Sequence, residues 1–345
     1  MREVILHVGM HKTGSSSIQN SLKHFDDTKT RYAQFDYANH SIPIFTIFSE
    51  KRQSYHIWKK MGYSPGHIEE LRRDYLFRLN NQLSDYSRER LIFSGEDICL
   101  LRDHEKYNLL QNLQRGGKKL TLICFTRHPQ DYAISIFQQM VKGGLDSIRT
   151  INPDYQFNLK YFYETCYESD FIVKDFTTEN AKYGDITKAF CSLASINPEL
   201  VTPIRVNESL SASALKLIYS LNRSFIKTFG SNKKFKARQN TIMEFSKAFP
   251  ISDDASKIDS KIAGGLVRCQ SDELEFIYKA FNILYELENN RTSIHGVHEY
   301  MSDLSDVDLE KLEMVLNNLE IPTSKLKNIE EAVKNIYEKI YESND

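Results

Sequence analysis

Residues 4–9 most constrain the fold of this chain, because an apolar, β-branched run leads there directly into a glycine-bounded loop. Residues 10–17 read Met-His-Lys-Thr-Gly-Ser-Ser-Ser. Ile18, Leu22 and Phe25 then recur at the spacing of one buried helix face. The pattern predicts a strand, a loop and a helix, an arrangement that directs backbone N–H groups and the helix dipole at an anion.

The side chains of this loop favour binding of a terminal phosphate or sulfate. Lys12 adds a full positive charge, and hydroxyl groups follow it. The glycine and hydroxyl residues of the predicted site are Gly9, Thr13, Gly14, Ser15, Ser16 and Ser17. The competing interpretation is an ordinary serine-rich helix N-terminus, in which the serines cap the helix and Lys12 lies in solvent.

Further strands are spaced as in a parallel sheet. Residues 91–93 and 119–125 read as strands, separated by a predicted helix over about 97–114 and a stop at Gly116-Gly117. This spacing suits a right-handed βαβ crossover. With a further strand at 171–173, the pattern predicts an α/β fold in which helices flank a parallel sheet.

The chain is 345 residues long, which allows about two domains or one large domain with insertions. We predict a single α/β domain over residues 1–345. Residues 26–89 mix aromatic and basic residues without strong strand signals. This insertion should lie near the mouth of the site and shape an acceptor pocket, or its aromatics simply pack small helices. Residues 303–345 predict a helical hairpin that packs on its own domain or mediates a homodimer.

The near-zero net charge argues against ligands that are attracted by the charge of the whole surface. Lys and Arg number 45 against 46 Asp and Glu, so any recognition of phosphate must be local, and nucleic acid is not expected as a partner. No apolar run approaches the roughly 18 residues of a membrane span. The five cysteines are scattered without a CxxC pair, which argues against a disulfide framework and a zinc site. We therefore expect a cytoplasmic protein with reduced, mostly buried cysteines.

The loop differs from that of nucleotide triphosphatases. In the GxxxxGK[ST] pattern a glycine directly precedes the lysine, whereas here His11 precedes Lys12 and Gly9 lies three residues upstream. The strand at 119–125 runs into Thr126-Arg127 and offers no Mg²⁺-binding aspartate. The sequence therefore predicts an anionic donor that Lys, Arg and backbone N–H groups handle without a metal ion.

Residues 6–19 resemble the 5′-phosphosulfate-binding loop of sulfotransferases that use 3′-phosphoadenosine 5′-phosphosulfate (PAPS), and are closest in style to the bacterial carbohydrate-sulfotransferase branch. Residues 127–135 are similar to the 3′-phosphate motif of that family, with Arg127 at a strand end and Ser135 eight residues on. Ser135 lies roughly 9 Å along the predicted helix, so both side chains can converge on one phosphate. The resemblance implies a three-layer, P-loop-type fold that binds PAPS through the loop residues, His11 included, and through Arg127 and Ser135. Otherwise Arg127 pairs with a carboxylate and Ser135 lies on a polar face.

The resemblance covers roughly the first 220 residues, discontinuously. It continues more weakly through residues 172–176, 184–186 and 205–211. Ser15 and Ser16 stand where threonines are commoner in the family, a change that keeps the hydroxyl donors. The late Arg-Lys-Gly cofactor loop of the cytosolic small-molecule branch has no counterpart here.

Sulfuryl transfer needs an in-line acceptor oxygen, stabilisation of the developing charge and a base for the hydroxyl proton. We predict that Lys12 stabilises the bridging oxygen. Glu96 is the predicted base, because it follows a strand whose carboxyl end faces the same crevice as the loop. His11, which can titrate near neutrality, is the alternative. In the competing interpretation, Ser94 and Asp97 form a capping box and Glu96 only complements the helix dipole.

The leading hypothesis is an enzyme that transfers the sulfo group of PAPS to a hydroxyl or amine of a glycan or glycolipid by in-line displacement. One alternative is a Mg²⁺-dependent P-loop kinase or nucleotide triphosphatase that acts on a small molecule. Another is a non-catalytic phospho-ligand-binding protein. Metal chelation tests the first alternative, and Lys12→Ala tests the second, in which it would cost affinity without any activity to lose.

Overall fold

The chain divides into two units, each of which brings together segments that lie far apart in the sequence. The computed structural model describes residues 3–167, 170–206, 209–225, 232–252, 257–288, 291–323 and 327–343. The first unit comprises Met1–His128, Asp154–Asn207 and Gln270–Tyr285, and the second comprises Pro129–Pro153, Glu208–Cys269 and Glu286–Asp345. A single domain over residues 1–345 stays a prediction.

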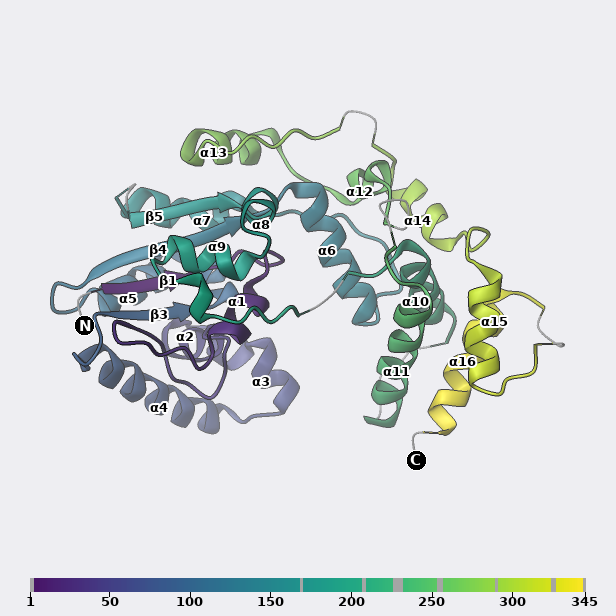
Figure 1. Ribbon diagram of the computed structural model, residues 1–345, viewed down its shortest axis with the longest axis horizontal. Helices are drawn as coiled ribbons and strands as arrows, with labels where there is room; N and C mark the ends of the chain where they lie inside the picture. The colour runs from purple at the N-terminus through teal and green to yellow at the C-terminus, as the bar shows by residue number, and fades with distance from the viewer. Residues whose placement is uncertain are drawn as a thin grey trace. The chain divides into compact units, whose positions relative to one another are not determined.

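In the described part of the chain, a five-stranded sheet with parallel neighbours forms the centre of the first unit (Figure 1). The strands lie in the order β2-β3-β1-β4-β5. Their bounds are β1 Glu3–His7, β2 Thr30–Tyr32, β3 Arg90–Ser94, β4 Lys119–Thr126 and β5 Phe171–Asp175. The predicted α/β fold, in which helices flank a parallel sheet, is thus confirmed.

Helices cover both faces of this sheet. Ile5 of β1 packs with Ile18 and Phe190, which come from α1 and α9 on one face. Alternate residues such as Leu6 point to the opposite face, the side on which α5 and α7 lie (Figure 1). The bounds are α1 Ser15–Leu22, α5 Asp103–Leu113, α7 Tyr155–Thr165 and α9 Ile186–Leu193. This two-sided burial explains why β1 and β4 read as nearly continuous apolar runs.

The chain leaves the central strand β1 on one side and later crosses to the other. From β1 it passes through α1 to β2 and returns to β3, and α5 then carries it across to β4. In open parallel sheets, ligands bind outside the carboxyl ends of the strands where the order reverses. Here that point is the end of β1, beside the ends of β3 and β4.

The insertion at 26–89 contains a strand that the sequence did not indicate. β2 has three residues and lies at one edge of the sheet, beside β3. Thr30 and Tyr32 are buried there and Arg31 is half-buried. Three residues are too few for an alternating pattern to stand out, so only the pairing with β3 identifies this strand.

Helices of three to 20 residues make up most of the rest of the insertion. They are α2 Ser41–Phe48, η1 Arg52–Ser54, α3 His56–Met61 and α4 Pro65–Ser84. Trp58 is completely buried and its Nε1 donates to Thr46 Oγ1 over 3.0 Å. Phe45 stacks on Tyr55 with ring centroids 4.5 Å apart. Several aromatics therefore pack these helices, and Tyr55 also reaches the site described below.

The single helix predicted over about 97–114 was wrong. A 3₁₀ helix, η2 (Glu96–Leu100), precedes α5, which begins separately. The buried carboxylate of Glu105 explains the new start, because it accepts the backbone N–H of Arg102 and also that of Glu50 from the insertion. The cap at Arg102 thus starts α5 as a helix separate from η2.

Further helices complete both units. The first unit also contains α8 Phe176–Tyr183, η4 Pro198–Leu200 and α13 Ser271–Phe281. The second contains α6 Pro129–Lys142, α10 Ala212–Phe225, α11 Asn232–Ala248, α12 Ser260–Leu266, α14 Ile294–Ser302, α15 Leu309–Asn318 and α16 Ile329–Glu342, packed around an apolar core. Every helix in the described residues is too short or too polar to span a bilayer.

Candidate active site

The loop after β1 stays hydrogen-bonded to β4. The Met10 N–H donates to the Phe125 carbonyl over 2.9 Å, and the Phe125 N–H donates to the Gly9 carbonyl over 2.8 Å. Gly9 has a φ of 105°, and a Cβ there would lie 3.1 Å from the carbonyl oxygen of Glu96. Glycine is therefore required both by its φ and by the close approach of the Glu96 backbone. The loop and the start of η2 lie against each other.

Two hydroxyls close the loop on itself. Thr13 and Ser15 are buried, and both donate to the Met10 carbonyl, over 2.7 Å and 3.2 Å. Gly14, with a φ of 79°, is the N-cap of α1, and no side chain among the described residues caps this helix. The first N–H groups of a helix need acceptors from outside the helix. The hydroxyls of Thr13 and Ser15 therefore bond within the loop and do not cap α1.

The main chain of Lys12 is joined to Arg127. Lys12 has a φ of 63°, a left-handed conformation that is uncommon for a residue with a side chain. Its carbonyl accepts a hydrogen bond from Arg127 Nη1 over 3.0 Å. The Arg127 guanidinium also lies 5.1 Å from the centre of the Phe176 ring. Strained backbone of this kind clusters at functional sites, so Lys12 and Arg127 mark one candidate site at the ends of β1 and β4.

The remaining residues predicted to bind the sulfo donor include Ser16, Ser17 and Ser135. Ser17 Oγ accepts the Val206 N–H over 3.3 Å, and Ser16 is half-buried. Ser135 is half-buried on α6, which belongs to the second unit. Its convergence with Arg127 on one phosphate therefore stays a prediction. In the weakly similar stretch 205–211, Asn207 and Glu208 lie outside the described residues.

His11 lies between two carboxylates. Its Nε2 is 3.0 Å from Asp97 Oδ1, and its Nδ1 is 3.9 Å from Glu96 Oε2. Asp97 is buried, whereas His11 and Glu96 are partly exposed. The two residues named as alternative bases are thus neighbours, and they share a third partner.

Burial and charge act together on the pKa values of this group. Burial alone lowers the pKa of His11, but the hydrogen bond to Asp97 and the charges of Glu96 and Asp97 outweigh it and raise that pKa above its ordinary value. Burial alone raises the pKa of Asp97, yet the hydrogen bond and charge of His11 lower it overall. Burial raises the pKa of Glu96, against the opposing charges of His11 and Lys12. These directions favour a protonated His11 beside an ionised Asp97.

Asp97 is a site residue that the sequence suggested only as a helix cap. Its Oδ2 accepts the Tyr55 hydroxyl over 2.5 Å, and its backbone N–H donates to Ser41 Oγ over 2.9 Å. Gly95 permits this approach, because a Cβ there would lie 2.5 Å from the Ser41 nitrogen. Tyr55 and Ser41 belong to the insertion, 42 and 56 residues away in the chain. No local pattern could have identified them. We call His11, Glu96, Asp97 and Tyr55 the acid clamp.

The capping box suggested for Ser94 and Asp97 is not formed by these side chains. Ser94 Oγ is hydrogen-bonded to His7 Nδ1 at 2.7 Å, and the Ser94 N–H donates to His40 Nδ1 over 3.1 Å. Both histidines are completely buried, and burial lowers the pKa of each to about 3. Both are therefore neutral near pH 7. His7 and Ser94 are the last residues of β1 and β3, and His40 directly precedes α2 and bonds to Ser94. We call these three residues the histidine floor.

Tyr285 is a second residue that the sequence did not indicate. Its hydroxyl lies 2.9 Å from Thr126 Oγ1 and donates to Asp175 Oδ2 over 2.8 Å. It therefore ties the end of β4 to the end of β5, directly before Arg127. Because 110 residues separate Tyr285 from Asp175, only the fold brings them together.

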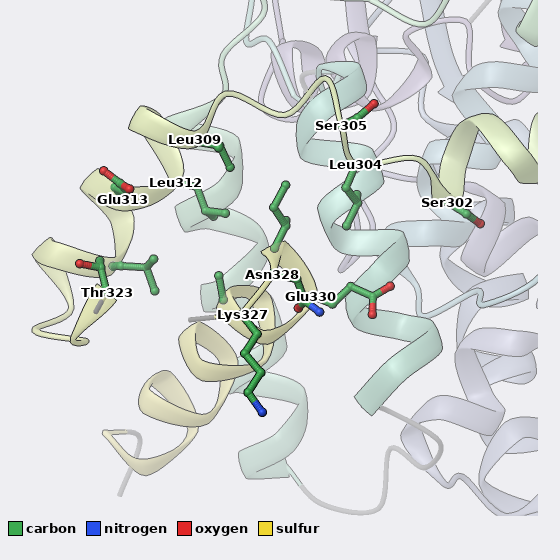
Figure 2. A pocket seen from close by; sticks show the side chains of 13 residues that line it. Ser302, Leu304, Ser305, Leu309, Leu312, Glu313, Thr323, Lys327, Asn328 and Glu330 are labelled. Atoms are coloured by element: carbon green, nitrogen blue, oxygen red, sulfur yellow. The ribbon is translucent and has the colours of Figure 1, made fainter. Parts of the chain in front are cut away.

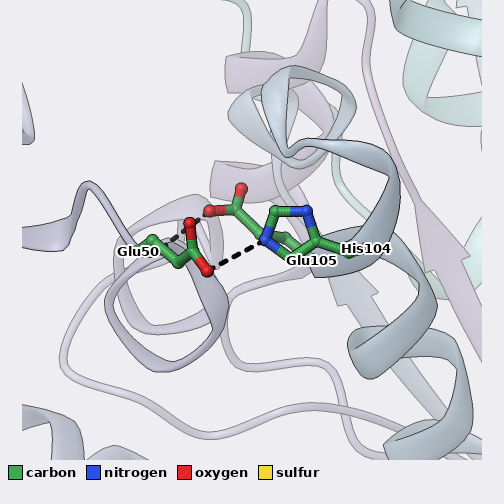
Figure 3. Close-up of side chains that lie close together, drawn as sticks. All are labelled: Glu50, His104 and Glu105. Atoms are coloured by element: carbon green, nitrogen blue, oxygen red, sulfur yellow. Dashed lines mark hydrogen bonds and ion pairs between the residues drawn. The ribbon is translucent and has the colours of Figure 1, made fainter.

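Glu50, His104 and Glu105 lie together, with possible metal-ligating atoms within 4.8 Å of one another (Figure 3). His104 Nε2 is 3.2 Å from Glu50 Oε1. The two oxygens of Glu105 accept the backbone N–H groups of Glu50 and Arg102. Ion pairing and helix capping account for this arrangement, and we assign no metal to it.

A cavity of about 540 Å³ lies in the second unit beside α15 and α16 (Figure 2). Its lining is largely apolar and includes Leu309, Leu312, Leu316 and Ile329. None of the described residues that line it is a predicted site residue. The candidate active site is therefore the carboxyl edge of the sheet.

No family model, curated protein or solved structure matches this chain. A functional assignment therefore depends on the motifs of the sequence and on the geometry at the ends of β1, β3 and β4. The proposal below uses both.

Proposed function

We propose that the protein is a PAPS-dependent sulfotransferase with a P-loop-type site. The observation that carries this proposal is a glycine-bounded, lysine-bearing loop at the end of the central strand, with the backbone of Glu96 packed on Gly9. A site for an anionic group thus lies beside a carboxylate that can accept a proton. The resemblance of residues 6–19 and 127–135 to family motifs favours PAPS as the donor.

In this proposal the donor is bound mainly by positive charge and backbone N–H groups. The 5′-phosphosulfate occupies the loop between Gly9 and Gly14, with Lys12 as its cation. Arg127 and Ser135 hold the 3′-phosphate. The hydrogen bond between Arg127 and the Lys12 carbonyl couples the two parts of the donor site. A net charge of −1 for the whole chain is compatible with this local concentration of cations.

The reaction is an in-line displacement at sulfur. Glu96 accepts the proton of the acceptor hydroxyl as the acceptor oxygen forms its bond to sulfur. The bond from sulfur to the bridging oxygen breaks, and Lys12 stabilises the charge that develops on the leaving 5′-phosphate. Glu96 is favoured over His11 as the base, because the hydrogen bond to Asp97 and the charges of Glu96 and Asp97 raise the pKa of His11 and favour its protonated form, which cannot accept a proton.

The alternatives predict different requirements. A P-loop kinase needs an acidic Mg²⁺ ligand near its loop, whereas Asp97, which lies close to this loop, already binds His11 and Tyr55. A non-catalytic phospho-ligand-binding protein needs the loop but no base. A glycan or glycolipid acceptor, a cytoplasmic location and a homodimer formed through residues 303–345 belong to our proposal.

The decisive experiment follows transfer of ³⁵S from labelled PAPS to a panel of glycans, glycolipids and phenols, with and without a metal chelator. We expect a labelled glycan or glycolipid product and no effect of the chelator. In thermal melting, adenosine 3′,5′-bisphosphate should stabilise the protein more than ATP does.

Lys12→Ala should abolish transfer, and Lys23→Ala, at an exposed lysine just after α1, serves as the matched control. Equal stabilisation by ATP and adenosine 3′,5′-bisphosphate would contradict the assignment of Arg127 and Ser135. Activity that requires Mg²⁺ and ATP would replace the proposal with the kinase alternative.

A further inference from the structure

We infer that Tyr55, Asp97 and His11 form a chain of positioning residues that holds a positive charge beside Glu96 and so keeps this carboxylate ionised. The role of Glu96 as the base rests on the proposed function, whereas the charge on His11 does not. Asp97 and Tyr55 then act as positioning residues, and His11 acts as a fixed cation and no longer as a candidate base.

The geometry around His11 favours the imidazolium form. A neutral imidazole has one N–H donor and one acceptor nitrogen, whereas an imidazolium has two donors. Here both ring nitrogens face carboxylate oxygens, Nε2 at 3.0 Å from Asp97 and Nδ1 at 3.9 Å from Glu96. Neither carboxylate can donate a hydrogen bond when ionised. At 3.9 Å the Nδ1 contact is too long for a hydrogen bond, but it sets a second carboxylate beside the ring, and two nearby negative charges stabilise the protonated imidazole.

Asp97 is fixed in place so that it can hold this charge. Its side chain accepts from His11 through Oδ1 and from Tyr55 through Oδ2. Its backbone N–H is bonded to Ser41, so the main chain is held as well. Tyr55 is itself fixed, because it is buried and stacks on Phe45. A buried carboxylate with charge-assisted hydrogen bonds on both oxygens stays ionised.

The charged groups around Glu96 act in opposite directions. His11, Lys12 and His56 favour the carboxylate form, whereas burial and the negative charge of Asp97 favour the carboxylic acid. Tyr55, which also contacts Asp97, is neutral because burial raises its pKa far above neutrality. Of these three groups, His11 acts most strongly on Glu96, and its own charge depends on Asp97. Loss of Asp97 should therefore leave His11 neutral and make Glu96 easier to protonate, even though a negative neighbour has been removed.

The first test is the pH dependence of sulfo transfer. In the wild-type enzyme the acid limb of kcat/KM reports protonation of Glu96. His11→Gln should move this limb upward by about one pH unit, since an opposite charge at this distance shifts a carboxyl pKa by about that much. Asp97→Asn should move it upward by less, because it also removes a negative charge beside Glu96. Tyr55→Phe should move it in the same direction by less. Tyr63→Phe, which removes another hydroxyl from the insertion, should leave it unchanged.

The second test needs no activity. In protein labelled with ¹⁵N at histidine and ¹³C at the glutamate carboxyl, NMR titration follows His11 and Glu96 directly, and the His11→Gln and Glu96→Gln variants assign the signals. We expect His11 to titrate above its ordinary value of about 6.5 and to fall toward or below it in Asp97→Asn. The Glu96 carboxyl should then titrate higher in both Asp97→Asn and His11→Gln.

The two tests separate the inference from the proposed function. If His11 titrates at or below about 6.5 in the wild type, or is unmoved in Asp97→Asn and Tyr55→Phe, the inference is overturned whether or not PAPS is the donor. It is equally overturned if His11 shifts and the Glu96 titration does not. If the expected titrations are seen but no sulfo group is transferred, the proposed function fails and the charge assignment stands.

Discussion

The histidine floor and the acid clamp both lie around the ends of β1 and β3, yet burial and charge act on their histidines in opposite directions. His7 and His40 are completely buried beside neutral partners, and burial lowers the pKa of each to about 3. His11 is partly exposed and faces Asp97 and Glu96, and its pKa is raised. Burial alone removes the charge from an imidazole, and a pair of carboxylates restores it. The same part of the molecule can therefore favour a charged histidine, His11, near two neutral ones, His7 and His40.

The largest expected effect concerns the clamp. Glu96→Gln keeps the size of the side chain but cannot accept a proton, so sulfo transfer should fall by about 10²- to 10⁴-fold. Because Glu96 is partly exposed and the substitution removes no packing, the melting temperature should stay nearly constant. Initial rates with saturating PAPS and thermal melting measure the two quantities. Glu70→Gln, at an exposed helix position, is the control. Full activity in Glu96→Gln would show that the base lies elsewhere.

The next largest effect is a loss of stability at low pH, which comes from the two buried histidines of the histidine floor. In the unfolded chain His7 and His40 bind protons below about pH 6.5, whereas in the folded protein their pKa values are about 3. The unfolded state therefore binds more protons as the pH falls, so this contribution to stability is complete above pH 6.5 and is lost toward pH 3. At pH 5 the loss should be about 2 kcal/mol for each histidine. Urea unfolding at pH 7.5, 6 and 5 measures it.

The same titration separates the clamp from the floor. His11 has a raised pKa, so it contributes stability below about pH 6.5 that is lost as the pH rises through its folded value. His11→Gln removes this contribution, and the loss of stability on acidification should become steeper in that variant. A shallower loss would mean that His11 is neutral in the folded protein.

A smaller change in stability is expected in the clamp from Tyr55→Phe. The substitution removes a hydroxyl that donates to the buried carboxylate of Asp97 and leaves the stacking on Phe45 in place. Loss of a hydrogen bond to a charged group should lower the free energy of unfolding by about 2 kcal/mol. Tyr63→Phe should change it by less than about 0.5 kcal/mol, because Tyr63 is partly exposed. Equal effects of the two substitutions would argue against a role for the Tyr55 hydroxyl.

The strand ends beside the histidine floor and the acid clamp could be predicted from the sequence, whereas the contacts of Asp97 within the acid clamp could not. β1, β3 and β4 were predictable because burial on both faces makes each an apolar run, and the loop after β1 is marked by its glycines. Glu96 and His11 were identified from their places beside those strands. Asp97 was visible, but its role depends on Tyr55 and Ser41, which no local pattern connects to it. The division of the helix predicted at 97–114 depends on the cap that Glu105 makes with Arg102, which the apolar pattern does not mark.

The smallest expected effect tests whether the floor and the clamp are independent. Ser94→Ala removes the hydroxyl that is bonded to His7 Nδ1 but keeps the backbone N–H that donates to His40. A neutral hydrogen bond contributes about 1 kcal/mol, so the free energy of unfolding should fall by about that amount. Because the Ser94 hydroxyl bonds to the floor and not to Glu96 or Asp97, the His11 titration should be unchanged. Urea unfolding and histidine NMR on the same variant measure both. A shift in the His11 titration would mean that the floor sets the position of the clamp, and the two regions would then have to be treated as one cooperative unit.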